Sequence, residues 1–225
     1  MGMKITFSFP DMLKLRFPKV NNVILIIIFS QFIFTAAAGL TTPLFAVFVL
    51  ENIGGGAVTV VGFAVAIYWI TKSLLQLPVA RRLDRVSGEM DDHNAMLAGS
   101  CIVTLTTFLF YFAHSIWHIY SLQVLMAIGD ALFIPPFYAI FSRHLDHEHV
   151  GFEWSLFSSF SVGAGSALGG IFSGLLASVA GIRMMFLING TLMLIGFIIL
   201  WFLRPYISPR MGATDGAMMI EQKRP

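Results

Sequence analysis

NNVILIIIFSQFIFTAAAGLTTPLFAVFVL, the stretch from Asn21 to Leu50, contains no charged residue. It is longer than the ~20 apolar residues with which a helix crosses a lipid bilayer. Three further uncharged runs extend from Asn52 to Thr71, from Asn94 to Gly129 and from Trp154 to Ile182. A water-soluble core does not need runs of this length, so the sequence predicts an integral membrane protein.

Turn residues divide these runs into six predicted spans: Val23 to Leu50, Ala57 to Val79, Met96 to Ala113, Ile116 to Phe141, Trp154 to Val179 and Met184 to Leu203. All six should be helices, because backbone in lipid must satisfy its own hydrogen bonds. The predicted fold is an all-α membrane protein. Residues 1–20 should form a cytoplasmic interfacial segment, 21–204 the transmembrane domain, and 205–225 a flexible cytoplasmic tail.

The basic residues indicate how the spans are oriented. They lie mainly in the terminal segments and in alternate loops: Lys4, Lys14, Arg16, Lys19, Arg81, Arg82, Arg85, Arg143, Arg204, Arg210, Lys223 and Arg224. The opposite loops contain only Arg183. By the positive-inside rule, both termini should be cytoplasmic. The net charge of +2 therefore reflects membrane topology, and we expect no nucleic-acid partner.

Two ionisable residues inside the spans are candidates for function, because charge within hydrocarbon is costly. Asp130 should lie ~16 Å from the inner end of the fourth span, close to the bilayer centre. Lys72 lies closer to the cytoplasmic end of the second span. Its stem can carry the ammonium to the headgroups, or the ammonium can approach Asp130 and hold it ionised.

Polar side chains form stripes on three of the predicted helices. Tyr68, Lys72 and Gln76 are four residues apart, so they share one helix face. A second stripe contains Gln123, Asp130 and Tyr138, and the first span adds Gln31, Thr35, Thr41 and Thr42. Facing polar stripes predict a water-accessible cavity for a substrate or a proton. The third and sixth spans are nearly all apolar, and we expect them to face lipid.

The fifth span is rich in small residues, including Gly165, Gly169, Gly170 and several serines. Small residues at four-residue spacing let another helix approach closely. We expect this face to pack against the second span of a partner subunit.

Two motifs resemble those of the major facilitator superfamily. The loop Ala80-Arg81-Arg82-Leu83-Asp84-Arg85-Val86-Ser87-Gly88 is similar to the family motif between its second and third helices, with Asp84 and Arg85 matching. Gly165-Ser166-Ala167-Leu168-Gly169-Gly170 is similar to a glycine-proline-x-x-glycine-glycine motif of the fifth helix, with Ser166 in place of proline. The resemblance covers about residues 20 to 204. It implies a gating role for Asp84 and Arg85, with Glu153 nearby.

The resemblance also implies a partner, because family members usually have two six-helix halves and this sequence resembles one. The partner is expected to be a second copy or a different six-helix chain. The arginine typical of proton-coupled exporters would fall at Leu125, so that motif is absent. The segment Tyr68 to Asp84, with Glu153-Trp154-Ser155 at the start of the fifth span, also resembles short, six-helix family members of small-genome bacteria, which implies the bacterial inner membrane.

We therefore expect a secondary-active transporter that moves a small solute by alternating access as a homodimer. The alternative is a non-transporting assembly or accessory subunit, which would use the packing face but not Asp130. No enzyme activity is expected: aspartyl proteolysis needs two carboxylates, and no phosphate-binding glycine loop is present. No cofactor or metal is expected, since the cluster from Arg143 to His149 is better explained as a solvated loop and Cys101 is the single cysteine.

Overall fold

The computed structural model describes residues 19–85 and 88–207. Within these residues, six helices are long and apolar enough to cross a membrane. The chain is an all-helical integral membrane protein, which confirms the predicted fold class. Most of the expected N-terminal interfacial segment, at residues 1–18, and most of the expected tail, at 208–225, lie outside the described residues.

The first span consists of α2 (Asn22–Thr41), a 3-10 turn η1 (Thr42–Leu44) and α3 (Phe45–Asn52). The next three spans are α4 (Val58–Leu83), α5 (Met90–Phe110) and α6 (Ile116–Arg143). The fifth consists of α7 (Val150–Leu156), a π-helix η2 (Phe157–Ala164) and α8 (Gly165–Ala180), and the sixth is α9 (Ile182–Trp201), followed by a 3-10 turn η3 (Arg204–Tyr206).

Local sequence explains the main breaks between these helices. Pro43 lies within η1, where the missing proline N–H interrupts the helical ladder and separates α2 from α3. Asn21 caps the start of α2, because its side-chain oxygen accepts a hydrogen bond from the Val23 N–H at 3.0 Å. Gly181 has φ +84°, a conformation that favours glycine, and it makes the tight connection between α8 and α9.

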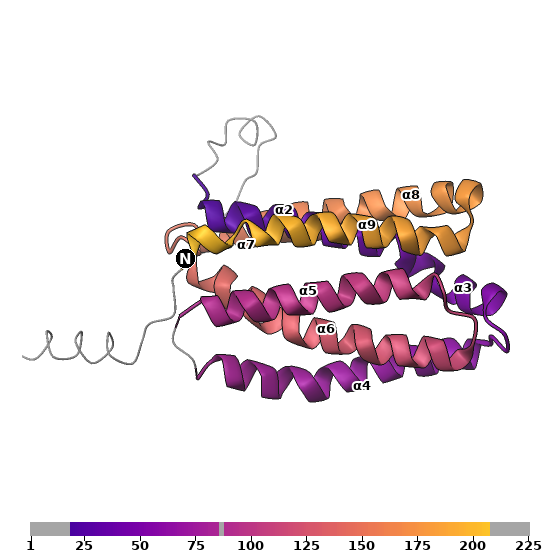
Figure 1. Cartoon of the computed structure of the whole chain (residues 1–225). Coiled ribbons are helices and arrows are strands. Elements are labelled where there is room, and N and C mark those ends of the chain that lie inside the picture. Colours follow the sequence, from indigo (N-terminus) through magenta and orange to yellow (C-terminus); the bar gives the residue numbers. More distant parts are fainter. Residues whose placement is uncertain (1–18, 86–87, 208–225) are drawn as a thin grey trace, which may run out of the picture.

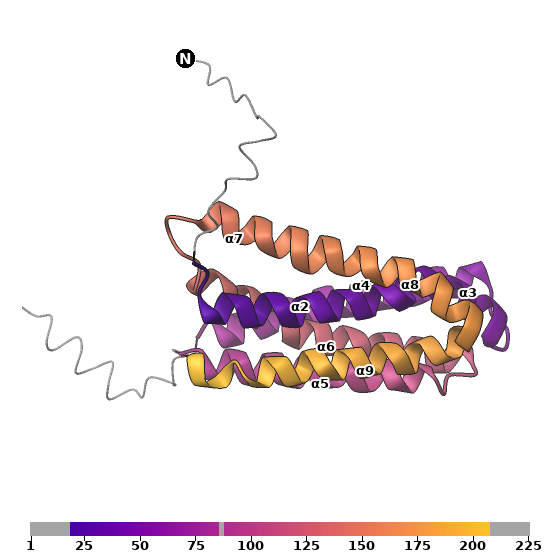
Figure 2. The ribbon, with the colours of Figure 1, turned by 90° about the horizontal axis from the view of Figure 1, so that it is seen from above.

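The helices form two layers (Figures 1 and 2). One layer contains α8, α2 and α9, with α2 in the middle, and the other contains α4, α6 and α5, with α6 in the middle. The layers pack together chiefly where α5 meets α9. At the other end of each layer, α4 and α8 lie apart (Figure 1). The described helices therefore form an open arc in the order α4, α6, α5, α9, α2, α8.

This order places different spans on the outside from those that the sequence predicted. In its most apolar window α5 has 50% of its residues buried, the largest share among the spans, because it packs on both α6 and α9. The corresponding share is 17% for α4 and also 17% for the fifth span. The third span, expected to face lipid, exposes only one face, with Leu105 and Leu109, whereas α4 and the fifth span, at the ends of the arc, are the most exposed.

The small residues of the fifth span pack against α2 of the same chain. A methyl group built on Gly169 would lie 2.3 Å from the Ala36 carbonyl oxygen, and one on Gly165 would lie 3.0 Å from that of Phe32. Both glycines are buried within the chain, so the expectation that they meet a partner's second span is wrong. Gly170 points into open space.

Two buried serines stabilise the same helix contact with hydrogen bonds. Ser161 donates to the Ile28 carbonyl oxygen at 2.9 Å, and Ser173 donates to that of Leu40 at 2.7 Å. Because apolar helices gain little from hydrophobic burial in lipid, close backbone approach and such hydrogen bonds are what hold them together.

The neighbouring glycines provide a matched test of this contact. Gly169→Ala should destabilise the purified protein by about 1–3 kcal/mol, because the new methyl group meets α2 backbone that cannot move aside. Gly170→Ala should leave stability unchanged or raise it by up to about 1 kcal/mol, since alanine is the better helix former. Thermal unfolding in mild detergent would measure both. Equal stability of the two variants would contradict the described packing.

Candidate functional site

A cavity of about 620 Å³ lies between the two layers. Its walls come from α2, α4, α5, α6, η2 and α9. Its size falls within the range of roughly 300–1,000 Å³ that is usual for small-molecule sites. The polar residues in its lining are Gln31, Thr35, Thr41, Thr42, Tyr68, Ser100, Thr107, Gln123, Asp130, Tyr138 and Asn189.

A chain of polar contacts joins α4 to α6 beside this cavity. The Tyr68 hydroxyl donates a hydrogen bond to Oδ2 of Asp130, and the Lys72 ammonium donates to the Tyr68 oxygen at 3.1 Å. Lys72 Nζ also lies 3.8 Å from Asp130 Oδ2 and 4.9 Å from the centre of the Trp69 ring. Lys72 is therefore held inward beside the carboxylate rather than at the headgroups.

Burial makes this cluster costly to leave unpaired. The Lys72 side chain is 10% exposed and that of Asp130 is 22% exposed. The sequence left two positions open for the Lys72 ammonium, and the geometry selects the one beside Asp130. An ion pair inside a membrane domain is expected at a site of substrate or ion handling.

The other residues of the predicted stripes divide into two groups. Gln31, Gln123 and Tyr138 line the cavity with Asp130 and Tyr68. Gln76 follows Lys72 by one turn of α4, is partly buried, and is not part of the lining. The cavity thus brings together three of the helices whose polar faces the sequence identified.

The three predicted gating residues do not form one cluster in the described contacts. Asp84 and Arg85 are exposed at the end of α4. Glu153 is 1% exposed, and its Oε2 accepts a hydrogen bond from the Asp146 N–H at 3.0 Å. Glu153 therefore holds the loop that precedes α7, and a gating role for Asp84 and Arg85 stays a prediction.

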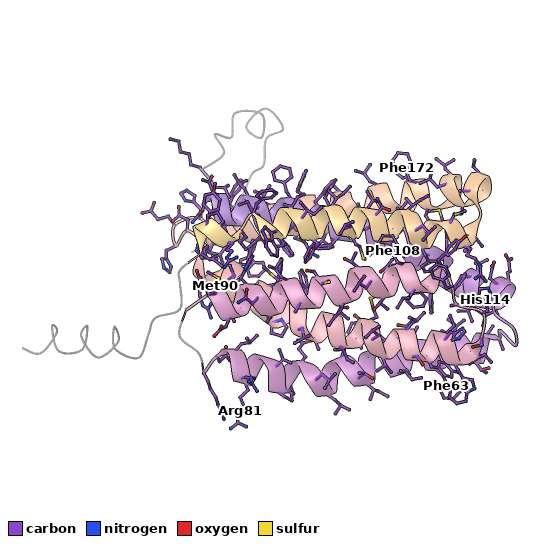
Figure 3. All side chains as sticks on the ribbon, in the orientation of Figure 1. Phe63, Arg81, Met90, Phe108, His114 and Phe172 are labelled. Carbon is purple, nitrogen blue, oxygen red and sulfur yellow. The ribbon has the colours of Figure 1, made fainter. Side chains whose placement is uncertain are left out.

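Sequence reasoning missed several polar contacts between helices. Arg143 at the end of α6 pairs with the buried Asp92 of α5 at 2.5 Å. His93 Nε2 lies 3.1 Å from the Leu200 carbonyl oxygen of α9. Asp92 and His93 belong to the first turn of α5, which the sequence assigned to a loop because it is charged. Figure 3 shows Arg81 and Met90 at this end of the bundle and His114 at the other.

Arg183, which the sequence assigned to a loop, lies in the first turn of α9 and has a structural role. Its guanidinium donates to the carbonyl oxygens of Tyr111 at 2.8 Å, Ala113 at 3.0 Å and Asn52 at 3.1 Å. Carbonyls at the ends of helices lack partners within the helix, so Arg183 satisfies groups at the ends of α3 and α5 together.

The cluster from Arg143 to His149 makes contacts of its own. Arg143 pairs with Asp92, His144 Nδ1 lies 3.4 Å from Glu89 Oε1, and His149 Nδ1 lies 3.0 Å from Asp146 Oδ2. The hydrogen bond from His149 lowers the pKa of the exposed Asp146 carboxyl. In residues 19–85 and 88–207, no group of three or more metal-binding side chains is arranged to hold a metal ion.

A double-mutant cycle tests the buried pair. Lys72→Met and Asp130→Asn should each lower the free energy of unfolding by about 3 kcal/mol, because each leaves the opposite charge buried without its partner. The double variant should recover more than half of the summed loss. Unfolding in mixed micelles would measure the four proteins. Additive losses would show that the two charges do not interact.

Comparison with known proteins supports the arrangement. Residues 27–217 match the family model of the Major Facilitator Superfamily. The fold resembles the crystal structure of the POT family transporter PepTSo, with a TM-score of 0.70 and 22% identity. That match covers 87% of this chain but 39% of the PepTSo chain, so the present chain spans well under half of it. No curated protein matches the sequence significantly. The family match covers most of the described helices, and the chain belongs to the major facilitator superfamily.

Proposed function

We propose that the chain is one half of a secondary-active transporter, and that two copies move a small solute across the membrane by alternating access. The observation that carries the proposal is the polar cavity between the layers, with the Lys72–Asp130 pair at its edge. A charged pair deep in a membrane domain is costly, and it is usually retained for substrate or ion handling.

The open arc supports the need for a second half. The two layers meet at α5 and α9, whereas α4 and α8 lie apart (Figure 1), and none of the described residues of α8 lines the cavity. Large apolar side chains cover both end helices, among them Phe63 and Leu77 on α4 and Leu175 and Val179 on α8. A second bundle across this side would enclose the cavity.

We assign the second bundle to another copy of the chain. The halves of such transporters are parallel repeats related by an axis along the membrane normal. A two-fold dimer reproduces that relation with both copies in the same orientation and with α4 of each copy facing α8 of the other. We place the termini and the Asp84 end of α4 on the cytoplasmic side, from the distribution of basic residues.

An accessory subunit would also use the exposed faces of α4 and α8. It would have no need of a charged pair beside a cavity, because apolar residues at Lys72 and Asp130 would pack at lower cost. The polar lining therefore favours transport over a purely structural role.

Cross-linking tests the proposed dimer. In a Cys101→Ser background, Phe63→Cys and Leu175→Cys lie at matching depth, each five residues from the same end of the bundle. They should form an intermolecular disulfide under mild oxidation and give a dimer band, because α4 of one copy faces α8 of the other. Leu109→Cys with Met184→Cys is the matched control, on exposed positions near that same end of α5 and α9. A dimer band from the control pair alone would contradict this interface.

Cysteine labelling tests the proposed gate. Asp84 lies at the end of α4, where its carboxylate would face the start of the partner's fifth span and its positive helix dipole. Asp84→Asn should weaken closure on that side and raise labelling of Tyr138→Cys, which lines the cavity, from the cytoplasmic face. Glu51→Gln, an exposed acid at the opposite end, is the control. Unchanged labelling in Asp84→Asn would remove the gating role.

A further inference from the structure

Two threonines fix the orientation of two side-chain amides in the cavity lining. Thr35 donates its hydroxyl proton to the Gln31 backbone carbonyl at 2.8 Å, and Gln31 Nε2 lies 3.4 Å from the same hydroxyl oxygen. Since a hydroxyl has one proton, the Gln31 amide must approach with its N–H group. The Gln31 side-chain carbonyl oxygen is buried and has no partner in the structure.

The same arrangement occurs on the other side of α2. Thr41 donates to the Ala38 carbonyl oxygen at 3.4 Å, and Asn189 Nδ2 donates to the Thr41 hydroxyl oxygen at 2.8 Å. Asn189 is buried, and its Oδ1 also has no partner in the structure. A buried acceptor without a partner costs roughly 1–3 kcal/mol, so two of them in one cavity wall indicate groups kept for a ligand.

Asp130 adds a third acceptor. Tyr68 and Lys72 both contact its Oδ2, and none of the hydrogen bonds of residues 19–85 and 88–207 uses its Oδ1. The hydroxyl protons of Thr42, Ser100 and Thr107 are also committed, each to a backbone carbonyl three or four residues earlier in the chain. The buried lining atoms that lack a partner, Gln31 Oε1 and Asn189 Oδ1, are both acceptors. The lining also keeps donors, since each of these two amides has a second N–H and Trp69, Gln123 and Tyr138 have donors of their own.

The rest of the lining excludes one class of ligand and suits another. Among the described residues, no Lys, Arg or His belongs to the cavity lining, and the Lys72 ammonium at its edge is already paired with Asp130, so a carboxylate or phosphate would find no unpaired cation in the lining. Aromatic side chains make up much of the remaining wall, including Phe34, Phe133, Phe137 and Phe186. Aromatic faces favour apolar bodies and attract cations.

We propose that the cavity binds a solute with N–H donors on a compact aromatic or apolar body and without an anionic group, with Gln31 Oε1, Asn189 Oδ1 and Asp130 Oδ1 accepting from it. This inference rests on the proposed function for its setting, and it names the substrate class of that site. An aromatic primary amine has the required form, because its ammonium supplies three donors.

Four probes that share one aromatic body separate the contributions of N–H donors and of charge to binding. They are 3-phenylpropylamine, its N,N,N-trimethyl derivative, 3-phenylpropan-1-ol and 3-phenylpropionate, each titrated calorimetrically into the full chain in detergent. The amine should bind at least about tenfold tighter than the trimethyl cation, which keeps the charge but lacks N–H donors, and the carboxylate should not bind. A carboxylate that binds as tightly as the amine, or a trimethyl cation equal to it, would overturn the proposal.

Variants locate the acceptors. Gln31→Leu and Asn189→Leu should each weaken amine binding about fivefold and leave the trimethyl cation unaffected. Asn189→Asp keeps an acceptor at that position and should retain amine binding, which separates loss of the acceptor from loss of folding. Gln76→Leu, a matched change outside the lining, should have no effect. Amine binding that is unchanged in both leucine variants would overturn the assignment.

Transport measured on the same protein in liposomes distinguishes this inference from the proposed function. Amine binding without transport of any probe would support the binding site and contradict the transporter. Transport of the carboxylate with no binding of the amine would support the transporter and contradict the proposed binding site.

Discussion

The bilayer core supplies no water to a polar group, so a hydrogen bond or ion pair between two helices in lipid stabilises their contact. Each adjacent pair in the arc has such a contact. Tyr68 with Asp130 joins α4 to α6, and Arg143 with Asp92 joins α6 to α5. His93 with Leu200 joins α5 to α9, Asn189 with Thr41 joins α9 to α2, and Ser161 of η2 and Ser173 of α8 join the fifth span to α2. Because lipid is as apolar as leucine, these contacts and close glycine packing select which helices become neighbours.

The open side of the arc follows from the same constraint. Both buried serines of the fifth span and its glycines at 165 and 169 are used on α2, and the polar stripe of α4 is directed to α6. The large side chains that α4 and α8 expose are mostly apolar, and among the described residues none of α8 lines the cavity. The open side of the arc is also the side on which our account places a second copy.

The sequence alone was sufficient for six helices and for most of the polar residues that line the cavity, Asp130 among them, because uncharged length and helical periodicity depend on local composition. Lys72 and Gln76 of the predicted α4 stripe lie outside the lining. It was not sufficient for helix neighbours. Gly165 and Gly169 were assigned to a partner subunit, since spacing shows that a face packs closely but not on which helix. The role of α5 was missed because Asp92 and His93 resemble loop residues until Arg143 and Leu200 are seen beside them. Asn189 was missed because an isolated polar residue in a nearly apolar span forms no polar stripe.

The central claim is that two copies of this chain enclose one polar cavity. Native mass spectrometry of the full chain, released from lipid nanodiscs after purification without cross-linker, tests it most directly. The account predicts particles that contain two copies of the chain and no other protein. Particles with a single copy throughout, or with one copy bound to a different six-helix chain, would contradict it.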